Sequence, residues 1–179
     1  MEKFIELKAI AAPLLEINID TDVIIPSREM KRVSKLGLGE GLFAGRRYTQ
    51  PGGRDENPEF VLNHTPYRDA QILLSGSNFG CGSSREHAVW AIQGANVGAV
   101  IAQTFARIFY RNCINCGFYV IELEDAPNKI ADGDELDIDY ENGIIDNKTQ
   151  GKKNEFKPLP DFAIEIINDG GLLEHIKKS

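Results

Sequence analysis

Residues 80–87 read GCGSSREH and gather groups that bind anions and move protons. Two serine hydroxyls, an arginine, a glutamate and a histidine stand together in this short segment. Gly80 and Gly82 allow the backbone a positive φ or a close approach to a ligand. The composition favours a carboxylate or phosphate site, and it supplies hydroxyls that nearby positive charge can activate.

The same segment precedes a helical pattern, and the start of a helix is itself attractive to anions. The first backbone N–H groups of a helix lack intrahelical partners, and the helix dipole adds positive charge there. Arg85 brings a permanent cation that can hold a carboxylate by two parallel hydrogen bonds. The spacing from Ser83 to Glu86, or from Ser84 to His87, equally suits a plain helix cap, and His87 suits a packed or hydrogen-bonded histidine. The residues alone leave both interpretations open, although complete phosphate-loop motifs are absent from the turn.

The elements around this turn alternate in the order of βαβ units. Apolar runs predict strands, and 3.6-residue spacing predicts helices. The expected strands cover 4–15, 70–76, 98–103 and 118–123, and the expected helices cover 84–96 and 104–116. This order is typical of parallel strand pairing. In the second helix, Phe105, Ile108 and Phe109 are expected to face the core.

The segments outside this alternating pattern differ in composition and periodicity. Two aspartates flank a threonine in INIDTDVIIP, where Asp20 is expected to form a turn. Helical propensity follows at 27–33, and glycine and proline at 36–60 predict a long loop, a kind of segment that is often functional. Period-two alternation at 133–159, with a hairpin signal at Asn142-Gly143, predicts a β-rich second part. The C-terminal end predicts short helices broken at Gly170-Gly171.

Composition and charge restrict the class of protein. The 179 residues are 42% hydrophobic and 26% charged, which is ordinary for one soluble domain, so we expect a single α/β domain over 1–179. A net charge of −7 argues against a nucleic-acid partner. Neither a signal peptide nor an apolar run long enough to span a membrane is evident. We therefore expect a cytoplasmic protein without a membrane partner, whose three cysteines are reduced.

Three segments together resemble a known family. NFGCGSSREHA at 78–88 is preceded by DTDVIIP at 20–26 and followed by IAQTFARIFYRNCINCG at 101–117. The three resemble the small subunits of 3-isopropylmalate dehydratases, a family similar to the swivelling C-terminal domain of aconitase. The resemblance spans about 4–121 and implies a swivelling β/β/α domain. It also implies a hydro-lyase subunit that isomerises 2-isopropylmalate to 3-isopropylmalate, by dehydration and rehydration, in leucine biosynthesis.

The resemblance implies roles for individual residues. Ser83 is the expected catalytic base, and the amides at the helix start together with Arg85 are suited to stabilising its alkoxide. Arg85 is expected to grip a substrate carboxylate, and Ser84 to support substrate binding. Asp22 is expected to hold a neighbouring side chain near the substrate. Supporting positions in the turn are Gly80, Gly82, Glu86 and His87.

In this family the segment that follows DTDVIIP, here SREMKRVSK at 27–35, contacts the variable group of the substrate. Met30 is expected to face an aliphatic substituent, and Lys31 or Arg32 a carboxylate, with a solvated basic turn as the alternative. Glu29-Met30 departs from the more common aromatic-leucine pair, which leaves the exact substrate open. The alternatives are small subunits of a homoaconitase or of a dimethylmalate or citraconate-type hydratase, or a non-catalytic anion-binding module.

The resemblance also implies what this chain leaves to a partner. The family's [4Fe-4S] cluster belongs to a separate large subunit, so we expect this chain to bind no metal or cofactor itself. We expect activity on a small 2-hydroxy di-acid only in a heterodimer or heterotetramer with that iron–sulfur subunit, whose contact includes the turn and the 36–60 loop. Cys81, Cys113 and Cys116 invite the alternative of a cluster in this chain. The family pattern instead favours Cys113 and Cys116 as small buried residues.

Overall fold

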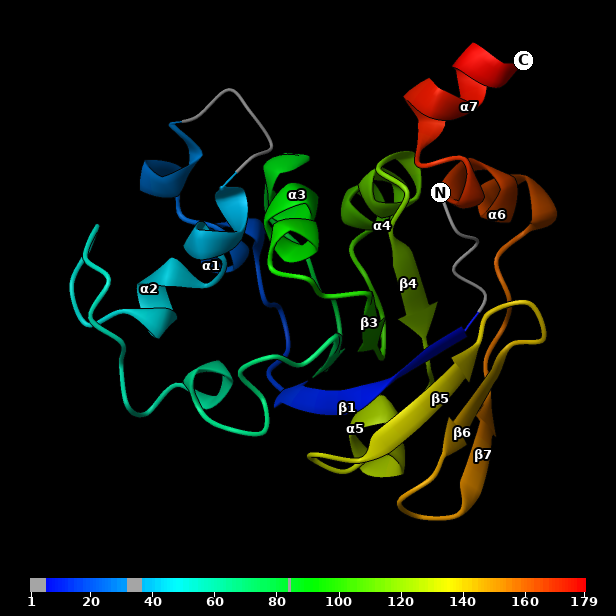
Figure 1. The fold of residues 1–179 in the computed structure, drawn as a ribbon, viewed down its shortest axis with the longest axis horizontal. Coiled ribbons are helices and arrows are strands. Elements are labelled where there is room, and N and C mark those ends of the chain that lie inside the picture. The colour runs from blue at the N-terminus through cyan, green and yellow to red at the C-terminus, as the bar shows by residue number, and fades with distance from the viewer. Residues whose placement is uncertain (1–5, 32–36, 84) are drawn as a thin grey trace.

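The computed structural model describes residues 6–31, 37–83 and 85–179, which form a curled seven-stranded sheet with helices packed against it (Figure 1). The strand order is β4-β3-β2-β1-β5-β6-β7. The strands are β1 (Glu6–Leu14), β2 (Ile72–Ser75), β3 (Ala99–Ala102), β4 (Tyr119–Glu122), β5 (Glu135–Asp139), β6 (Ile144–Asn147) and β7 (Lys152–Glu155).

Strand β1 joins a parallel and an antiparallel half of the sheet. Its residues 11–14 pair in parallel with β2, and its residues 6–10 pair antiparallel with β5. Strands β2, β3 and β4 continue the parallel half, as the alternating strand and helix pattern predicted. Strands β5 and β6 form the expected hairpin around Asn142-Gly143, where Gly143 has a φ of 68°. A positive φ of this kind is the reason that the turn uses glycine.

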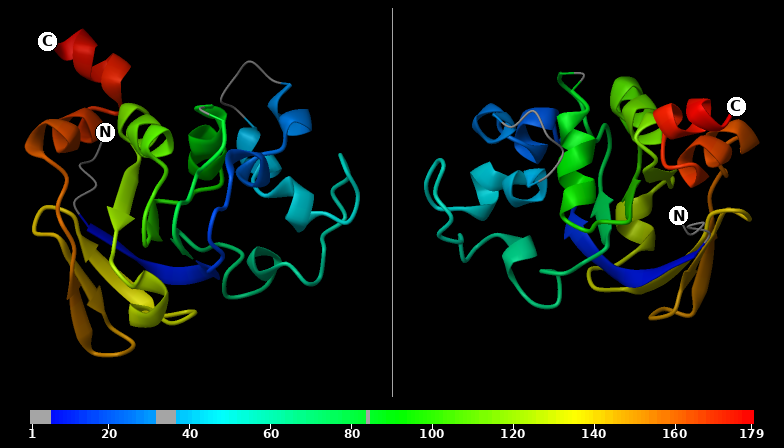
Figure 2. Two further views of the ribbon diagram at one scale, coloured as in Figure 1. Left: turned by 180° about the vertical axis from the view of Figure 1, so that it is seen from behind. Right: turned by 45° about the horizontal axis from the view of Figure 1, so that its top comes forward.

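Alternate residues of the parallel strands point to opposite faces and build two cores. Leu73, Val100 and Val120 pack toward α3 (His87–Gly94) and α4 (Arg107–Asn115). Residues of the opposite face join α5 (Ala126–Lys129) and the antiparallel strands in the second core. Figures 1 and 2 show α3 and α4 side by side, with α5 inside the curl. Because both faces are covered, these strands read as continuous apolar runs in the sequence.

The C-terminal segment forms two short helices, α6 (Asp161–Asn168) and α7 (Leu172–Lys178), which are separated at Gly170-Gly171 as expected. Ile167 of α6 is buried in the second core, whereas α7 projects from the body of the protein (Figure 1).

The prediction of a long loop over 36–60 was wrong for residues 38–47. Residues 38–47 form η2 (Leu38–Gly41) and α2 (Ala44–Arg47), and Leu42 and Phe43 are fully buried. A Cβ added at Gly39 would lie 2.4 Å from the carbonyl carbon of Gly94 in α3, so two glycines let these backbones touch. Residues 49–56 are mostly exposed and keep the character of a loop.

Two helix predictions need correction. The first helix after the turn begins at His87 and not at Ser84. Ile108 is 51% exposed, although Phe105 and Phe109 are buried as expected. Helix α4 begins at Arg107, and one residue is a rotation of about 100° around a helix axis, so Ile108 faces away when Phe109 faces inward.

Candidate active site at the carboxyl edge of the sheet

Three segments meet where the parallel strands β1, β2 and β3 end. The Gly80 amide donates a hydrogen bond to the Ile19 carbonyl at 2.7 Å, and the Thr21 amide donates to the Cys81 carbonyl at 2.8 Å. On the other side, the Ala106 amide donates to the Phe79 carbonyl at 2.9 Å. The GCGSSREH turn is therefore held between the segments that follow β1 and β3. Open α/β sheets place ligand sites at this edge.

The start of the turn depends on close packing at Gly80. Its φ is 82°, and a Cβ added there would lie 2.2 Å from Cγ of Phe109. Gly82 also has a positive φ, of 95°. Phe109 stacks edge-on against Phe79, with ring centroids 5.4 Å apart. Helix α4 therefore packs against the turn through Phe109. Close packing and a positive φ explain the glycine at position 80, and a positive φ explains the glycine at position 82.

Ser83, the expected base, lies exposed at the surface of this edge, and its hydroxyl contacts a buried partner. Its Oγ lies 3.0 Å from Oγ1 of Thr21, which is only 4% exposed. Thr21 opens the short helix α1 (Thr21–Ile24), whose N-cap is Asp20, and Asp20 Oδ1 accepts a 2.8 Å hydrogen bond from the Val23 amide. Asp20 is thus the turn-forming residue that the sequence predicted. The sequence analysis did not identify Thr21 as a site residue. The only local indication was its position between Asp20 and Asp22.

The alternative of a plain helix cap fits Ser83 and Glu86 poorly. Glu86 occupies the N-cap position of α3 in a helical conformation, and no hydrogen bond from its side chain caps the helix. Ser83 instead pairs with Thr21. The ring of His87 packs against Trp90, with centroids 4.9 Å apart. Ser84, the second serine, lies outside the described residues.

Arg85 and Met30 come from distant parts of the chain and meet beside the turn. Arg85 is exposed, and its Nη1 lies 3.9 Å from Sδ of Met30. Met30 ends the 3₁₀ helix η1 (Ser27–Met30) and is half-buried against the first core. The structure therefore brings the expected carboxylate grip and the expected alkyl contact together.

The other residues that are expected to bind the substrate are exposed or lie outside the described residues. Lys31 and Asp22 are both exposed, with Asp22 in the first turn of α1. Arg32 lies outside the described residues. Glu29, which the sequence analysis treated only as a departure from the family pattern, forms an ion pair with Arg54 at 2.8 Å.

The cysteines do not provide a fitting cluster site in the described part of the chain. Cys113 is fully buried, and burial, followed by the neighbouring Cys116, raises the pKa of its thiol well above the usual range. Metal ligation needs the thiolate, so this environment opposes it. Cys116 and Cys81 are half-buried. The described residues contain no group of three or more His, Cys, Asp or Glu side chains arranged to hold a metal ion.

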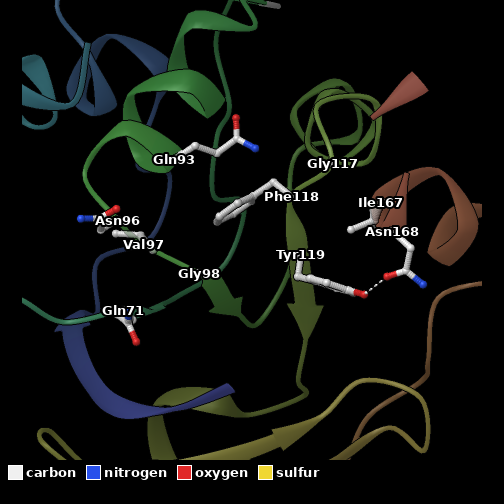
Figure 3. Close-up of a pocket in the computed structure, with 10 residues that line it drawn as sticks. All are labelled: Gln71, Gln93, Asn96, Val97, Gly98, Gly117, Phe118, Tyr119, Ile167 and Asn168. Carbon is white, nitrogen blue, oxygen red and sulfur yellow. Dashed lines mark hydrogen bonds between the residues drawn. The ribbon is translucent and has the colours of Figure 1, made fainter. Parts of the chain in front are cut away.

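A cavity of about 360 Å³ lies elsewhere, near the amino ends of β3 and β4 (Figure 3). Gln93 and Asn96 line one side, and Tyr119 and Asn168, joined by a 3.2 Å hydrogen bond, line the other. None of the described residues that line it is charged. A dicarboxylate needs cationic partners, so this cavity suits the expected substrate less well than the carboxyl edge does.

None of the helices formed by the described residues has the length and apolar character that crossing a membrane requires.

Comparisons with known proteins give a consistent result. Residues 1–126 match the Aconitase C-terminal domain family. The 3-isopropylmalate dehydratase small subunit of Cupriavidus necator is 58% identical over 123 residues, which cover 69% of this chain and 59% of that relative. The one of Methanosarcina mazei is 44% identical over 161 residues, which cover 90% and 91%. A crystal structure of 3-isopropylmalate dehydratase from Methanocaldococcus jannaschii matches with a TM-score of 0.80 and 33% identity, covering 97% of this chain and 94% of that one.

Proposed function

The chain belongs to the family of 3-isopropylmalate dehydratase small subunits, which carry an aconitase C-terminal domain, and from that premise we propose that it serves the isomerisation of 2-isopropylmalate to 3-isopropylmalate. The substrate loses water between two neighbouring carbons and regains it with the hydroxyl on the other carbon. The reaction needs a base for a C–H proton beside a carboxylate, cations for the substrate's carboxylates, and help for the departing hydroxyl.

Ser83 is the proposed base, and its surroundings are suited to that task. A serine hydroxyl takes up a proton only if its alkoxide is stabilised. Thr21 lies at hydrogen-bond distance and can donate to that oxygen. The start of α3 and the guanidinium of Arg85 add positive potential on the same edge.

Arg85 and Met30 are proposed to orient the substrate. The guanidinium binds one carboxylate by two parallel hydrogen bonds, and the thioether side chain of Met30 offers a flexible apolar contact for the isopropyl group. Ser84, Lys31 and Arg32 are proposed to complete the substrate's polar contacts, and Asp22 to hold a neighbouring side chain near the substrate by hydrogen bonding.

A larger partner subunit is implied by the name of the relatives, and we propose that it carries a [4Fe-4S] cluster. When bound, that cluster supplies the Lewis acid for the departing hydroxyl. The proposed assembly is a heterodimer or heterotetramer in the cytoplasm, in which the edge that bears Ser83 and Arg85 faces the partner. The proposal depends on two contacts made by one turn, that of Ser83 with Thr21 and that of Arg85 with Met30.

The test is turnover by the chain combined with its large subunit and reconstituted with iron and sulfide. We expect isomerisation of isopropylmalate and, for Ser83→Ala, a fall in kcat of at least about 10³-fold. Ser77→Ala is the matched control, because Ser77 lies on the same edge and its described contact is a backbone one. Near-normal turnover by Ser83→Ala would exclude the serine base.

A panel of hydroxy di-acids distinguishes the alternatives. Preference for homocitrate, dimethylmalate or citramalate-type substrates over isopropylmalate would assign a related hydro-lyase. Binding of isopropylmalate without turnover, with a fully loaded and otherwise competent large subunit, would assign a non-catalytic anion-binding module.

A further inference from the structure

The exposed 48–59 segment is tied to η1 by one arginine. Arg54 donates from Nη2 to Oε2 of Glu29 at 2.8 Å and from Nη1 to Oε1 at 3.3 Å. The hydrogen bonds with Glu29 raise the pKa of the Arg54 guanidinium. The same guanidinium lies over the ring of Tyr48, 4.8 Å from its centroid. The arginine is therefore held by a carboxylate on one side and an aromatic face on the other.

Glu29 itself is set into the protein surface and is not a free acidic side chain. Its side chain is 10% exposed, against 46% for Arg54. A Cβ added at Gly41 would lie 2.8 Å from Cβ of Glu29, so η2 packs directly against it. Ion pairs between exposed side chains contribute little, but removing one partner of a buried charge leaves the other uncompensated. Within η1, Nε of Arg28 also lies 3.8 Å from Oε1 of Glu29, so the contribution of Arg54 is to link this largely buried carboxylate to the 48–59 segment.

The position of η1 affects the candidate site through Met30, the residue after Glu29. Met30 follows Glu29 in the same 3₁₀ helix and contacts Arg85 at 3.9 Å. The position of Met30 thus depends on how η1 is held, to which Glu29 contributes through Arg54 at 2.8 Å and through Arg28 at 3.8 Å.

We propose that Glu29 and Arg54 are positioning residues, which together hold Met30 against Arg85 and so determine how tightly the site takes the substrate's alkyl group. The inference rests on the proposed function. It assigns a role in substrate selection to the 48–59 segment.

The kinetic test uses the reconstituted complex and the variants Arg54→Gln, Glu29→Gln and the double variant. We expect KM for isopropylmalate to rise about fivefold in each single variant, with kcat within about twofold, because a ground-state contact is loosened. The double variant is expected to resemble the single ones, since residues of one pair act non-additively. Additive effects, or a change in kcat alone, would refute the proposal.

The chain offers a matched control in Glu56→Gln. Glu56 forms a bidentate pair with Arg68, which is 48% exposed, and this pair does not include η1. We expect Glu56→Gln to leave KM unchanged. Equal increases of KM in the Glu56 and Arg54 variants would show a general effect of charge loss and would overturn the positioning role.

Hydrogen exchange of the free chain separates this inference from the proposed function, because it needs neither substrate nor partner. The Glu29 amide donates to the Pro26 carbonyl at 2.9 Å. In Arg54→Gln we expect its exchange to accelerate about tenfold, with no change in Glu56→Gln. If exchange is unchanged, the positioning role of Glu29 and Arg54 is refuted, even when isopropylmalate is turned over. If exchange accelerates but isopropylmalate is not turned over, the positioning of η1 by this pair is supported and the proposed substrate is refuted.

Discussion

Thr21→Val removes the hydroxyl that contacts Ser83 and keeps a side chain of nearly the same shape. The two hydroxyl oxygens lie 3.0 Å apart, and Thr21 is 4% exposed. If Ser83 is the base, Thr21 donates to an oxygen on which negative charge develops. A hydrogen bond to a charged group contributes about 1.5–3 kcal/mol, against about 1 kcal/mol for a neutral pair.

The energy of the charged hydrogen bond affects kcat, and the energy of the neutral hydrogen bond affects the stability of the folded chain. A loss of about 1.5–3 kcal/mol from the transition state lowers kcat by roughly 10- to 150-fold. The folded chain has Ser83 exposed to water, so its hydroxyl finds another partner. We therefore expect stability to fall by about 1 kcal/mol or less, which shifts Tm by about 2–4 °C in a chain of this size.

The assay compares Thr21→Val with Thr21→Ser in the reconstituted complex, at saturating isopropylmalate, and follows thermal unfolding of the free chain. Thr21→Ser keeps the hydroxyl and loses a methyl group, so we expect kcat within a fewfold of the unmodified complex. Near-normal kcat in Thr21→Val would refute the idea that Thr21 stabilises the base. A large fall in kcat with an equally large loss of stability in both variants would assign Thr21 a structural role.

Three further predictions concern the rest of the fold. Gly39→Ala is expected to destabilise the chain by about 3 kcal/mol in urea unfolding, because its Cβ meets the α3 backbone at 2.4 Å. Cys113 is expected to resist iodoacetamide until the chain unfolds, whereas half-buried Cys81 reacts, as mass spectrometry of the labelled native protein can show. Lys178, then His175, lower the pKa of the Asp169 carboxyl below its ordinary 3.8, so their pairing stabilises α7 above that pH and is lost as the pH falls through the lowered pKa. The difference in Tm between the unmodified chain and Asp169→Asn is therefore expected to vanish in acid.

Local patterns were enough to predict the parallel half of the sheet and the place of the turn. Apolar runs identified β2, β3 and β4, and periodicity identified the helices between them. The position of the turn follows from that topology, since a segment after a parallel strand must lie at the carboxyl edge. The same reasoning could not foresee that 38–47 is buried, because glycines that let two backbones touch look like loop glycines in a sequence.

Contacts between distant residues were the part that local patterns could not supply. Thr21 and Ser83 are 62 positions apart, and Glu29 and Arg54 are 25 apart. No periodicity links either pair, and each residue alone has an ordinary role on a polar surface. Only the three-dimensional arrangement shows that the Thr21 hydroxyl contacts Ser83.

The exposure of the turn is itself informative about the mechanism. Ser83 and Arg85 both face solvent in the isolated chain. In water, hydrogen bonds and charges are screened, and a serine hydroxyl does not act as a useful base. If these residues carry out the proposed chemistry, another surface must cover them and exclude water, so that Thr21, Arg85 and the start of α3 act at full strength on the same oxygen. The small-subunit name of the relatives is consistent with such a cover.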